Sequence, residues 1–381
     1  MKIVLVHHQD PANIHAFSGT SYFMSKAIRE IFDVVAEYHC LELPDTFRQV
    51  YAQGIRKTLQ PIGARLTSFL RSNKIEADFV ICQGGNSSIP YYCYHIPVVF
   101  WHDSTWHTLL KGYGDPEVFR VFKSTCRNFY QWDKSALRKT DILLYSSQFV
   151  ADACIREYGV PPEKTGVIPF GANIAASPSM RFLEDALQVR LASATLNLTF
   201  LGKDWERKGL PDAFLLAEQL NKLGRATTLN VIGCQPDIAH MKDAPFVRWL
   251  GFLDKSKKHD LEILEDVLRE THFMVHPARS EAFGIALCEA NAYGVPVIGT
   301  PVEGLKTIVE HGLNGYLFDQ EEWVAKATGL IESVMSDLEA RYTPLFRAAH
   351  REYHRRLNWD VNVRELKKML SSYRQAVPLR P

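Results

Sequence analysis

Two glutamates eight residues apart, Glu281 and Glu289, are the strongest candidates for chemistry in this 381-residue chain. The stretch 276–300 has the pattern of a short buried strand, a loop, and a helix over 285–292 that stops at a glycine. Glu281 therefore falls in the loop at the N-terminus of the helix, and Glu289 falls inside the helix. The pattern predicts two carboxylates at one strand-to-helix junction.

A strand-to-helix junction of this kind can bind an anion and a polyol together. Backbone amides near Phe283 and Gly284 suit a diphosphate, because a helix N-terminus carries unsatisfied donors and a partial positive charge. Glu281 beside them could accept hydrogen bonds from sugar hydroxyls, and Glu289 could accept them from a ribose diol. The alternative is that Glu281 caps the helix and Glu289 is a surface charge. The spacing by itself leaves both open.

The second candidate is the segment "GKDWERKG" at 202–209, which contains Lys203 and Lys208 between a predicted strand and a predicted helix. Cations in such a loop could neutralise a departing diphosphate. A solvated basic turn is the alternative interpretation.

The first half of the chain offers polar residues at strand ends. His102 and Asp103 end a predicted strand over 97–103, and His7 and His8 end the first one. Gly19 lies just before a predicted helix, where it allows close backbone approach next to free amides. His102 could equally be a strand-end histidine with only local partners. His95 and His107 are interpreted as structural or surface residues.

Strand and helix patterns alternate along both halves of the chain, which predicts α/β domains with doubly wound parallel sheets. Ligands bind such sheets at the carboxyl ends of the strands. The stretch 172–194 is small, polar and weakly patterned, as in a linker. The expected organisation is a first domain, a linker, a second domain and a final helix, over 1–175, 176–194, 195–357 and 358–381.

Composition excludes several classes of protein. With 44 Lys+Arg, 43 Asp+Glu and a net charge of +1, the chain lacks the basic excess typical of nucleic-acid binding. The seven cysteines form no C-x-x-C pair, which favours reduced thiols in a cytoplasmic protein over a disulfide framework or a zinc site. No apolar run approaches the ~20 residues of a membrane span. No G-x-G-x-x-G motif supports a nicotinamide dehydrogenase.

Five segments, in order, resemble glycosyltransferase family 4, the "group 1" retaining glycosyltransferases. The stretch 276–300 resembles the family's E-x7-E signature, and 202–209 resembles its G-R-x4-K-G element. "VIPFGANI" (167–174) is similar to V-x-P-N-G-V-D, "EHGLNGYLF" (310–318) to D-G-x-N-G-x-L-F, and "FSGTS" (17–21) to the glycine loop after the first strand. The resemblance extends over nearly the whole chain.

The resemblance implies a GT-B fold of two Rossmann-like domains facing a central cleft. The first domain would bind the acceptor and the second the nucleotide-sugar, with the final helix crossing back to the first. Glu281 would then contact the hydroxyls of the donor sugar, Glu289 the ribose, and Lys208 the diphosphate. Backbone amides would help at three residues, Ala282, Phe283 and Gly284.

The resemblance also implies roles in the first domain, where family members often carry a His or Asp near the reacting sugar. His102 could hydrogen-bond that sugar or the departing charge, and Asp103 could orient it or take the acceptor proton. Two departures from the family pattern occur. Lys203 replaces an arginine and loses its bidentate fork, and Glu303 replaces the first glycine of a Gly-Gly pair, which puts a carboxylate near the sugar pocket.

A basic segment over 48–74 contains no Asp or Glu. Such a face could dock on an anionic membrane surface, where lipid-linked acceptors reside. A solvated helix face is the alternative.

The sequence therefore predicts a cytoplasmic retaining glycosyltransferase of carbohydrate biosynthesis. It would move a sugar from a nucleotide-sugar to a hydroxyl acceptor, which could be a glycan, a lipid-linked molecule or a small molecule. No D-x-D motif occurs, so no metal is expected. A nucleotide-sugar epimerase or hydrolase, or a non-catalytic nucleotide-sugar-binding protein, is the alternative.

Overall fold

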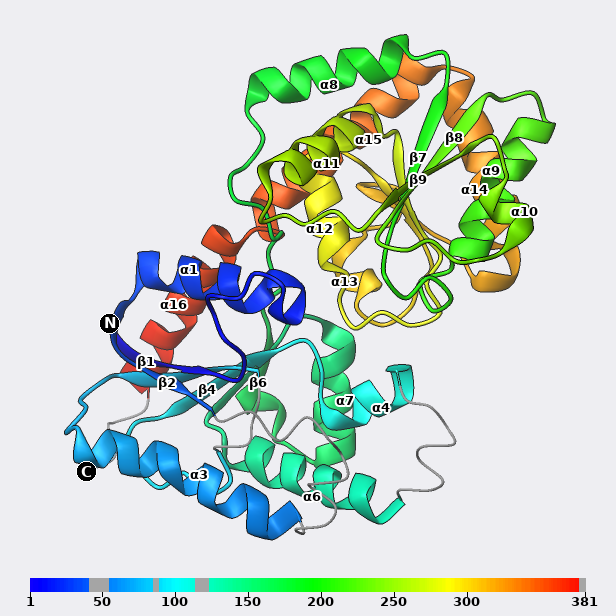
Figure 1. Cartoon of the computed structure of the whole chain (residues 1–381). Helices are drawn as coiled ribbons and strands as arrows, with labels where there is room; N and C mark the ends of the chain where they lie inside the picture. Colours follow the sequence, from blue (N-terminus) through cyan, green and yellow to red (C-terminus); the bar gives the residue numbers. More distant parts are fainter. Residues whose placement is uncertain (41–54, 85–88, 114–122, 377–381) are drawn as a thin grey trace. The chain divides into compact units, whose positions relative to one another are not determined.

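The computed structural model describes residues 1–40, 55–84, 89–113 and 123–376. The chain forms two compact units (Figure 1). Unit 1 contains Met1–Phe170 and the segment that starts at Trp359, and unit 2 is Gly171–Asn358. Each unit contains one parallel sheet with helices on both faces.

Unit 1 is built on a six-stranded sheet in the order β2-β1-β3-β4-β5-β6. All paired neighbours are parallel. The inner strand β1 is buried along five of its six residues, as expected for a β-branched run covered on both faces. The strands are β1 (Lys2–His7), β2 (Asp33–His39), β3 (Phe79–Gln83), β4 (Val98–His102), β5 (Ile142–Tyr145) and β6 (Thr165–Val167).

Helices cover both faces of this sheet, with α1 and α16 on one and α3 and α6 on the other (Figure 1). The final helix packs on α1, and Lys367 Nζ donates to the Ile31 carbonyl at 2.9 Å. The helices are α1 (Thr20–Ile31), α3 (Ile55–Ser72), α4 (Trp106–Tyr113), α6 (Lys123–Lys139), α7 (Gln148–Tyr158) and α16 (Trp359–Ala376), with short 3-10 turns at Ala16–Gly19 and Pro162–Lys164.

Unit 2 has a second six-stranded parallel sheet, in the order β12-β11-β10-β7-β8-β9. The chain runs from β7 outward to β9, then returns to place β10 on the other side of β7. The strand order therefore reverses between β7 and β10, and ligands of doubly wound sheets bind at this switch point. The strands are β7 (Leu196–Leu201), β8 (Thr227–Ile232), β9 (Val247–Gly251), β10 (Phe273–His276), β11 (Val297–Gly299) and β12 (Gly315–Leu317).

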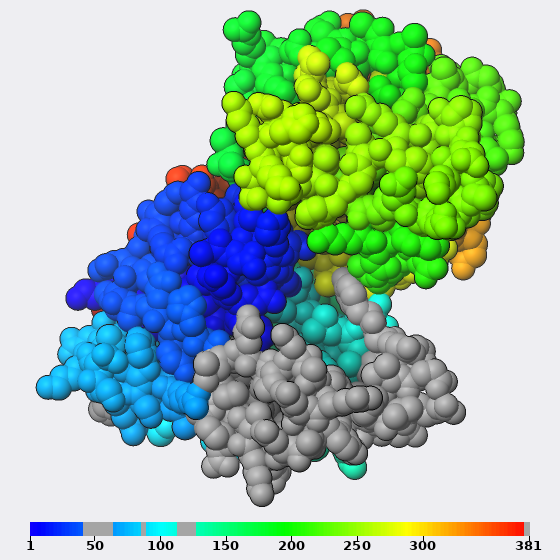
Figure 2. Space-filling view, viewed as in Figure 1, coloured from blue at the N-terminus to red at the C-terminus, as the bar shows by residue number. Residues whose placement is uncertain are grey.

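The helices of unit 2 pack in pairs on the two faces of the sheet, α9 with α14 on one and α12 with α15 on the other (Figure 1). In the space-filling view the gaps between the ribbons of each unit are filled by side chains (Figure 2). The helices are α8 (Met180–Ala192), α9 (Leu210–Lys222), α10 (Ala239–Lys242), α11 (Lys258–Glu270), α12 (Ile285–Ala292), α13 (Leu305–Ile308), α14 (Trp323–Met335) and α15 (Leu338–Arg356), with a 3-10 turn at Gln320–Glu322.

The segment 176–194, predicted as a linker, contains helix α8 over Met180–Ala192 instead. The apolar pattern of this helix is weak, because one of the residues on its buried face is an arginine, Arg190. The Arg190 guanidinium donates to the Leu268, Arg269, Tyr293 and Gly294 carbonyls and to the Tyr342 hydroxyl. These partners lie 78 or more residues away, so local sequence gives no sign of them.

Three edge or near-edge strands, β2, β9 and β12, were not predicted. Their residues are mostly half-exposed and lack the apolar runs of the inner strands.

None of the helices in the described residues is long and apolar enough to cross a membrane. Of the basic segment over 48–74, Arg48 and the side chains of Arg56 and Lys57 lie outside what the structure describes, whereas Arg65, Arg71 and Lys74 are exposed. Exposure fits both the membrane-docking and the solvated interpretation.

Candidate active site

Three loops meet at the switch point of unit 2. They follow the adjacent strands β7, β10 and β11, whose carboxyl ends share one edge of the sheet. The first loop holds the two lysines, the second holds Glu281, and the third holds Glu303. The topology therefore brings together residues that lie about 100 positions apart in the chain.

Two glycines let these loops touch. Gly209 has φ +81°, and a Cβ there would lie 2.0 Å from the Pro277 carbonyl oxygen. A Cβ on Gly304 would lie 2.1 Å from the Ala282 carbonyl oxygen and 2.5 Å from the Phe283 Cα. Any side chain at either glycine would separate the loops, so both glycines are required to bring the site residues into contact.

Glu281 lies at the centre of this edge, with its side chain largely buried. Its Oε2 lies 2.9 Å from Lys208 Nζ, 3.2 Å from His276 Nε2 and 3.7 Å from Arg207 Nη1. The N-cap residue of α12 is Gly284, with φ +100°. Glu281 lies three positions before it, and its role as a helix cap or as a ligand contact stays a prediction.

The charges of this cluster follow from burial and contact. Burial alone would raise the pKa of Glu281, but the ammonium of Lys208, the hydrogen bond from His276 and the guanidinium of Arg207 hold that pKa well below its ordinary value. Burial lowers the pKa of His276 despite its bond to Glu281. At neutral pH the cluster thus holds an ionised carboxylate, a neutral imidazole donating from Nε2, and two cations.

Glu289 is buried inside α12 and is 4% exposed, so the surface-charge alternative is wrong. Its Oε1 lies 2.5 Å from Lys255 Nζ. Lys255 follows β9 and was not predicted as a site residue. The two glutamates of the motif therefore have separate cationic partners in the structure.

The two lysines of the first loop differ in their surroundings. Lys208 is mostly buried and bonded to Glu281, so it is not part of a solvated turn. Lys203 is exposed, and its Nζ lies 4.4 Å from the centroid of the Phe252 ring, a cation–π contact. Lys203 is therefore held at the rim of the site rather than in the Glu281 cluster.

In unit 1, His102 ends β4 and has local partners. Its Nδ1 lies 3.2 Å from the Ser104 amide nitrogen and 3.3 Å from Asp103 Oδ1. In the part of the chain that the structure describes, Nε2 of His102 has no hydrogen-bond partner. That nitrogen is the one His102 could offer to a ligand.

An aromatic ring covers His102 from the glycine loop. The Phe17 ring stacks on the imidazole, with centroids 5.2 Å apart and planes 7° apart. Phe17, Ser18 and Gly19 all have positive φ, of 51°, 55° and 86°, and Gly19 is the N-cap of α1. Left-handed backbone at two non-glycine residues is unfavourable, so the loop stores strain beside His102. The sequence did not predict the Phe17 contact.

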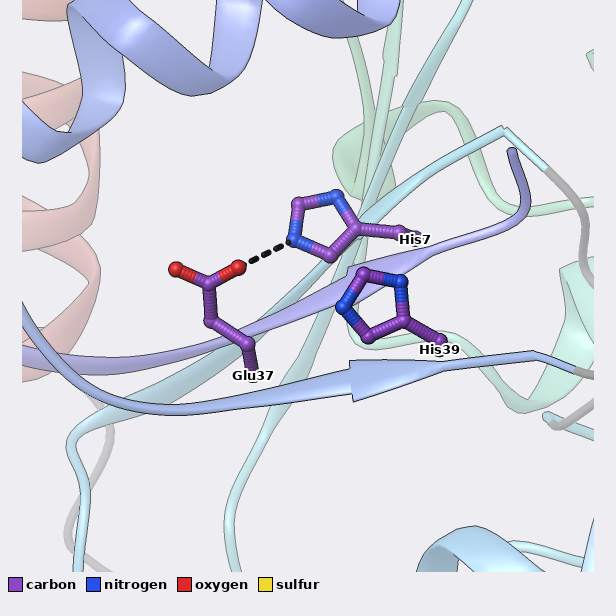
Figure 3. Close-up of side chains that lie close together, drawn as sticks. All are labelled: His7, Glu37 and His39. Carbon is purple, nitrogen blue, oxygen red and sulfur yellow. Dashed lines mark hydrogen bonds and ion pairs between the residues drawn. The ribbon is translucent and has the colours of Figure 1, made fainter. Parts of the chain in front are cut away.

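His7 belongs to a second polar cluster at the ends of β1 and β2 (Figure 3). Its Nε2 lies 2.9 Å from Glu37 Oε2, and the His7 and His39 ring centroids lie 4.9 Å apart. The possible ligand atoms of these three residues lie within 4.8 Å of one another. However, Arg29 donates to both Glu37 oxygens, at 2.8 and 3.0 Å. Like-charge repulsion from the guanidinium disfavours a divalent cation here, so the cluster fits an ion-paired network better than a metal centre.

Three further histidines of the first half were considered in the sequence. His8 is half-buried and His95 is exposed. The backbone amide of His107 donates to the Tyr158 hydroxyl.

The chain resembles known proteins in sequence and in fold. Residues 195–334, which include Lys208, Glu281 and Glu289, match the sequence model of the family described as "Glycosyl transferases group 1". The D-inositol 3-phosphate glycosyltransferase of Xylanimonas cellulosilytica is 28% identical over 260 residues, covering 65% of this chain and 60% of that protein. The match therefore spans less than two thirds of that relative.

Two solved structures show the same fold over almost the whole chain. The Anabaena protein Alr3699/HepE, in complex with UDP and glucose, has a TM-score of 0.66 at 18% identity, covering 98% of this chain and 100% of that one. The sucrose-phosphate synthase of Thermosynechococcus elongatus has a TM-score of 0.69 at 15% identity, covering 99% and 100%. The predicted GT-B fold, with two Rossmann-like domains, is confirmed, and the findings support a group 1 glycosyltransferase.

Proposed function

We propose that this protein is a retaining glycosyltransferase that moves a sugar from a nucleotide-sugar to a hydroxyl acceptor. The observation that carries the proposal is the buried cluster of Glu281, Lys208 and His276 at the switch point of unit 2. The cluster lies within the region that matches group 1 glycosyltransferases. The presence of UDP and glucose in the Anabaena structure supports a nucleotide-sugar as the donor class.

In this proposal unit 2 binds the donor. Lys208 and Arg207 supply positive charge for the diphosphate, with help from the backbone at Ala282, Phe283 and Gly284. Glu281 is ionised because its pKa is held low, so it can only accept hydrogen bonds, as contact with sugar hydroxyls requires. Glu289, with Lys255, would bind the ribose, and Lys203 would meet the outer part of the donor.

The proposed reaction breaks the bond between the anomeric carbon and the diphosphate oxygen. The acceptor oxygen forms a bond to that carbon on the same face, and its proton passes to the departing diphosphate oxygen. The residues of unit 2 then act by positioning and by stabilising charge. No metal ion is needed in this scheme, because the lysine and arginine side chains neutralise the leaving group.

Unit 1 would bind the acceptor. The Nε2 of His102, which has no hydrogen-bond partner among the described residues, suits a hydrogen bond to the reacting sugar, and Asp103 could orient that imidazole. The strained loop through Gly19 would place backbone beside this site.

A transfer assay tests the proposal against its rivals. Purified protein would be incubated with UDP-, GDP-, ADP- and dTDP-sugars, with and without a mixture of glycan, lipid-linked and small hydroxyl acceptors. We expect release of nucleotide diphosphate that depends on acceptor and yields a product of retained configuration. Release without acceptor, or a changed sugar on the nucleotide, would instead indicate a hydrolase or an epimerase. Binding without turnover would indicate a non-catalytic sensor.

A further inference from the structure

Glu303 departs from the family pattern in a strained backbone conformation. It lies between β11 and α13, with φ +32°. A side chain at positive φ is unfavourable, whereas glycine, which the resemblance places here, adopts this conformation freely. The chain therefore keeps a glutamate where glycine would relieve strain, which indicates that the carboxylate makes a compensating contact.

That contact is with the backbone of Glu281. Glu303 Oε2 accepts hydrogen bonds from the Glu281 amide at 2.7 Å and from Ser280 Oγ at 2.8 Å. The amide of the next residue, Gly304, donates to the Glu281 carbonyl at 3.1 Å. Both peptide groups of Glu281 are thus bonded to residues 303 and 304.

These bonds fix the residue at the centre of the cluster. A bond from an amide to a carboxylate is stronger than one to a neutral acceptor, and the loop around Glu281 is mostly buried, so an amide left without an acceptor would be unfavourable. The side chain of Glu281 must reach Lys208 and His276 from this backbone. A shift of the peptide would move the carboxylate away from both.

We infer that Glu303 is a positioning residue that holds the Glu281 backbone and so aims its carboxylate. This inference rests on the proposed function for its catalytic consequence, but not for the hydrogen bonds themselves. It also explains why glutamate stands here in place of glycine. The Glu303 side chain supplies a hydrogen-bond acceptor for the Glu281 amide, and glycine has no side chain that could do so.

Three variants distinguish the loss of the hydrogen-bond acceptor at residue 303 from the relief of backbone strain there. Glu303→Gln keeps an acceptor oxygen, Glu303→Ala removes it, and Glu303→Gly removes it while relieving the positive φ. Hydrogen exchange of a peptide covering 278–284 would be measured without any ligand. We expect the Ala and Gly variants to exchange at least about tenfold faster than wild type, and the Gln variant to stay within about threefold.

The same variants would be assayed for transfer with whichever donor wild type uses. We expect kcat to fall about tenfold or more in Glu303→Gly, with the donor KM changed by less than about threefold, and to recover in Glu303→Gln. Wild-type exchange or wild-type kcat in Glu303→Gly would overturn the inference. The Gly variant keeps the test decisive if Glu303→Ala does not fold.

If wild type turns over no nucleotide-sugar, the proposed function fails, while the exchange comparison still decides the role of Glu303.

Discussion

The two units hold their candidate residues by different means. In unit 2, Glu281 is fixed by contacts from three loops, with partners 5 to 74 residues away. In unit 1, His102 is bonded to residues one and two positions away and stacks with two aromatic rings, those of Phe17 and Phe100. Glu281 of unit 2 is largely buried among charged side chains, whereas His102 and Asp103 of unit 1 are partly exposed.

The difference indicates that the unit 2 residues are held more rigidly than those of unit 1. Long-range bonds between packed loops preorganise charge, as binding a constant diphosphate requires. The hydrogen bonds of His102 are local and lie beside a strained loop, so they leave its side chain more freedom. Such freedom is expected for an acceptor site, because the acceptor differs between proteins of one fold. The comparison predicts that changes in unit 2 will affect every reaction of the protein, whereas changes in unit 1 will depend on the acceptor.

The largest effect is expected for Glu281→Gln. The substitution removes the ionised carboxylate and leaves the buried ammonium of Lys208 with a neutral amide in place of a charged partner. We expect transfer to fall by about 10²–10³-fold with every acceptor, measured as kcat/KM for the donor. The exposed Glu262, which forms a surface pair with Lys258, provides a matched Glu→Gln control that should stay near wild type. Equal activity in the two variants would contradict the site assignment.

The pH dependence of the unfolding free energy tests the buried contacts of unit 2 through one histidine, His272. His272 Nδ1 accepts from the Asn197 amide and Nε2 donates to the Arg190 carbonyl, and burial lowers its pKa to about 4. The unfolded chain, with a pKa of about 6.5, binds more protons below that pH. Unfolding free energy should therefore fall as pH decreases from 6.5 towards 4, by at most about 3 kcal/mol.

Urea unfolding of wild type and His272→Gln at pH 7.5 and pH 5 measures the contribution of His272 to this pH dependence. The glutamine variant should be less stable at pH 7.5 but should lose less stability on acidification. An identical loss in both proteins would show that His272 does not contribute.

A smaller effect is expected in unit 1. His102→Ala removes the nitrogen proposed to meet the sugar and should lower kcat about tenfold, the value of one hydrogen bond. Asp103→Asn, compared under the same conditions, shows whether the neighbouring carboxylate matters as much. The size of the decrease should differ between acceptors. A uniform decrease across acceptors would contradict the contrast drawn between the units.

The smallest effect is expected for Lys203→Ala, because Lys203 is exposed and makes one cation–π contact with Phe252. Donor affinity should weaken about two- to fivefold, measured by titration calorimetry. Lys203→Arg should restore it, since a guanidinium also stacks on an aromatic ring. A loss as large as that for Lys208 would place Lys203 inside the site rather than at its rim.

Local patterns predicted most inner strands and the helix at 285–292, because buried β-branched runs and glycine stops leave a clear trace in sequence. The pattern also correctly placed Glu281 in the loop before α12 and Glu289 inside that helix. What remained hidden depends on contacts between distant residues. Helix α8 is anchored by Arg190, and no periodicity marks a helix held by one buried guanidinium. The partners Lys255 and His276 were likewise missed, because only the order of strands brings them to the glutamates.

We propose that the switch point of unit 2 binds the diphosphate of a nucleotide-sugar through Lys208. The most direct measurement is a thermal-shift titration of wild type and Lys208→Met with UDP-, GDP-, ADP- and dTDP-sugars. Saturation at 100 times the dissociation constant should stabilise wild type by about 2.7 kcal/mol with one nucleotide series, and Lys208→Met should lose most of that shift. No shift with any nucleotide-sugar, or equal shifts in the two proteins, would contradict the account.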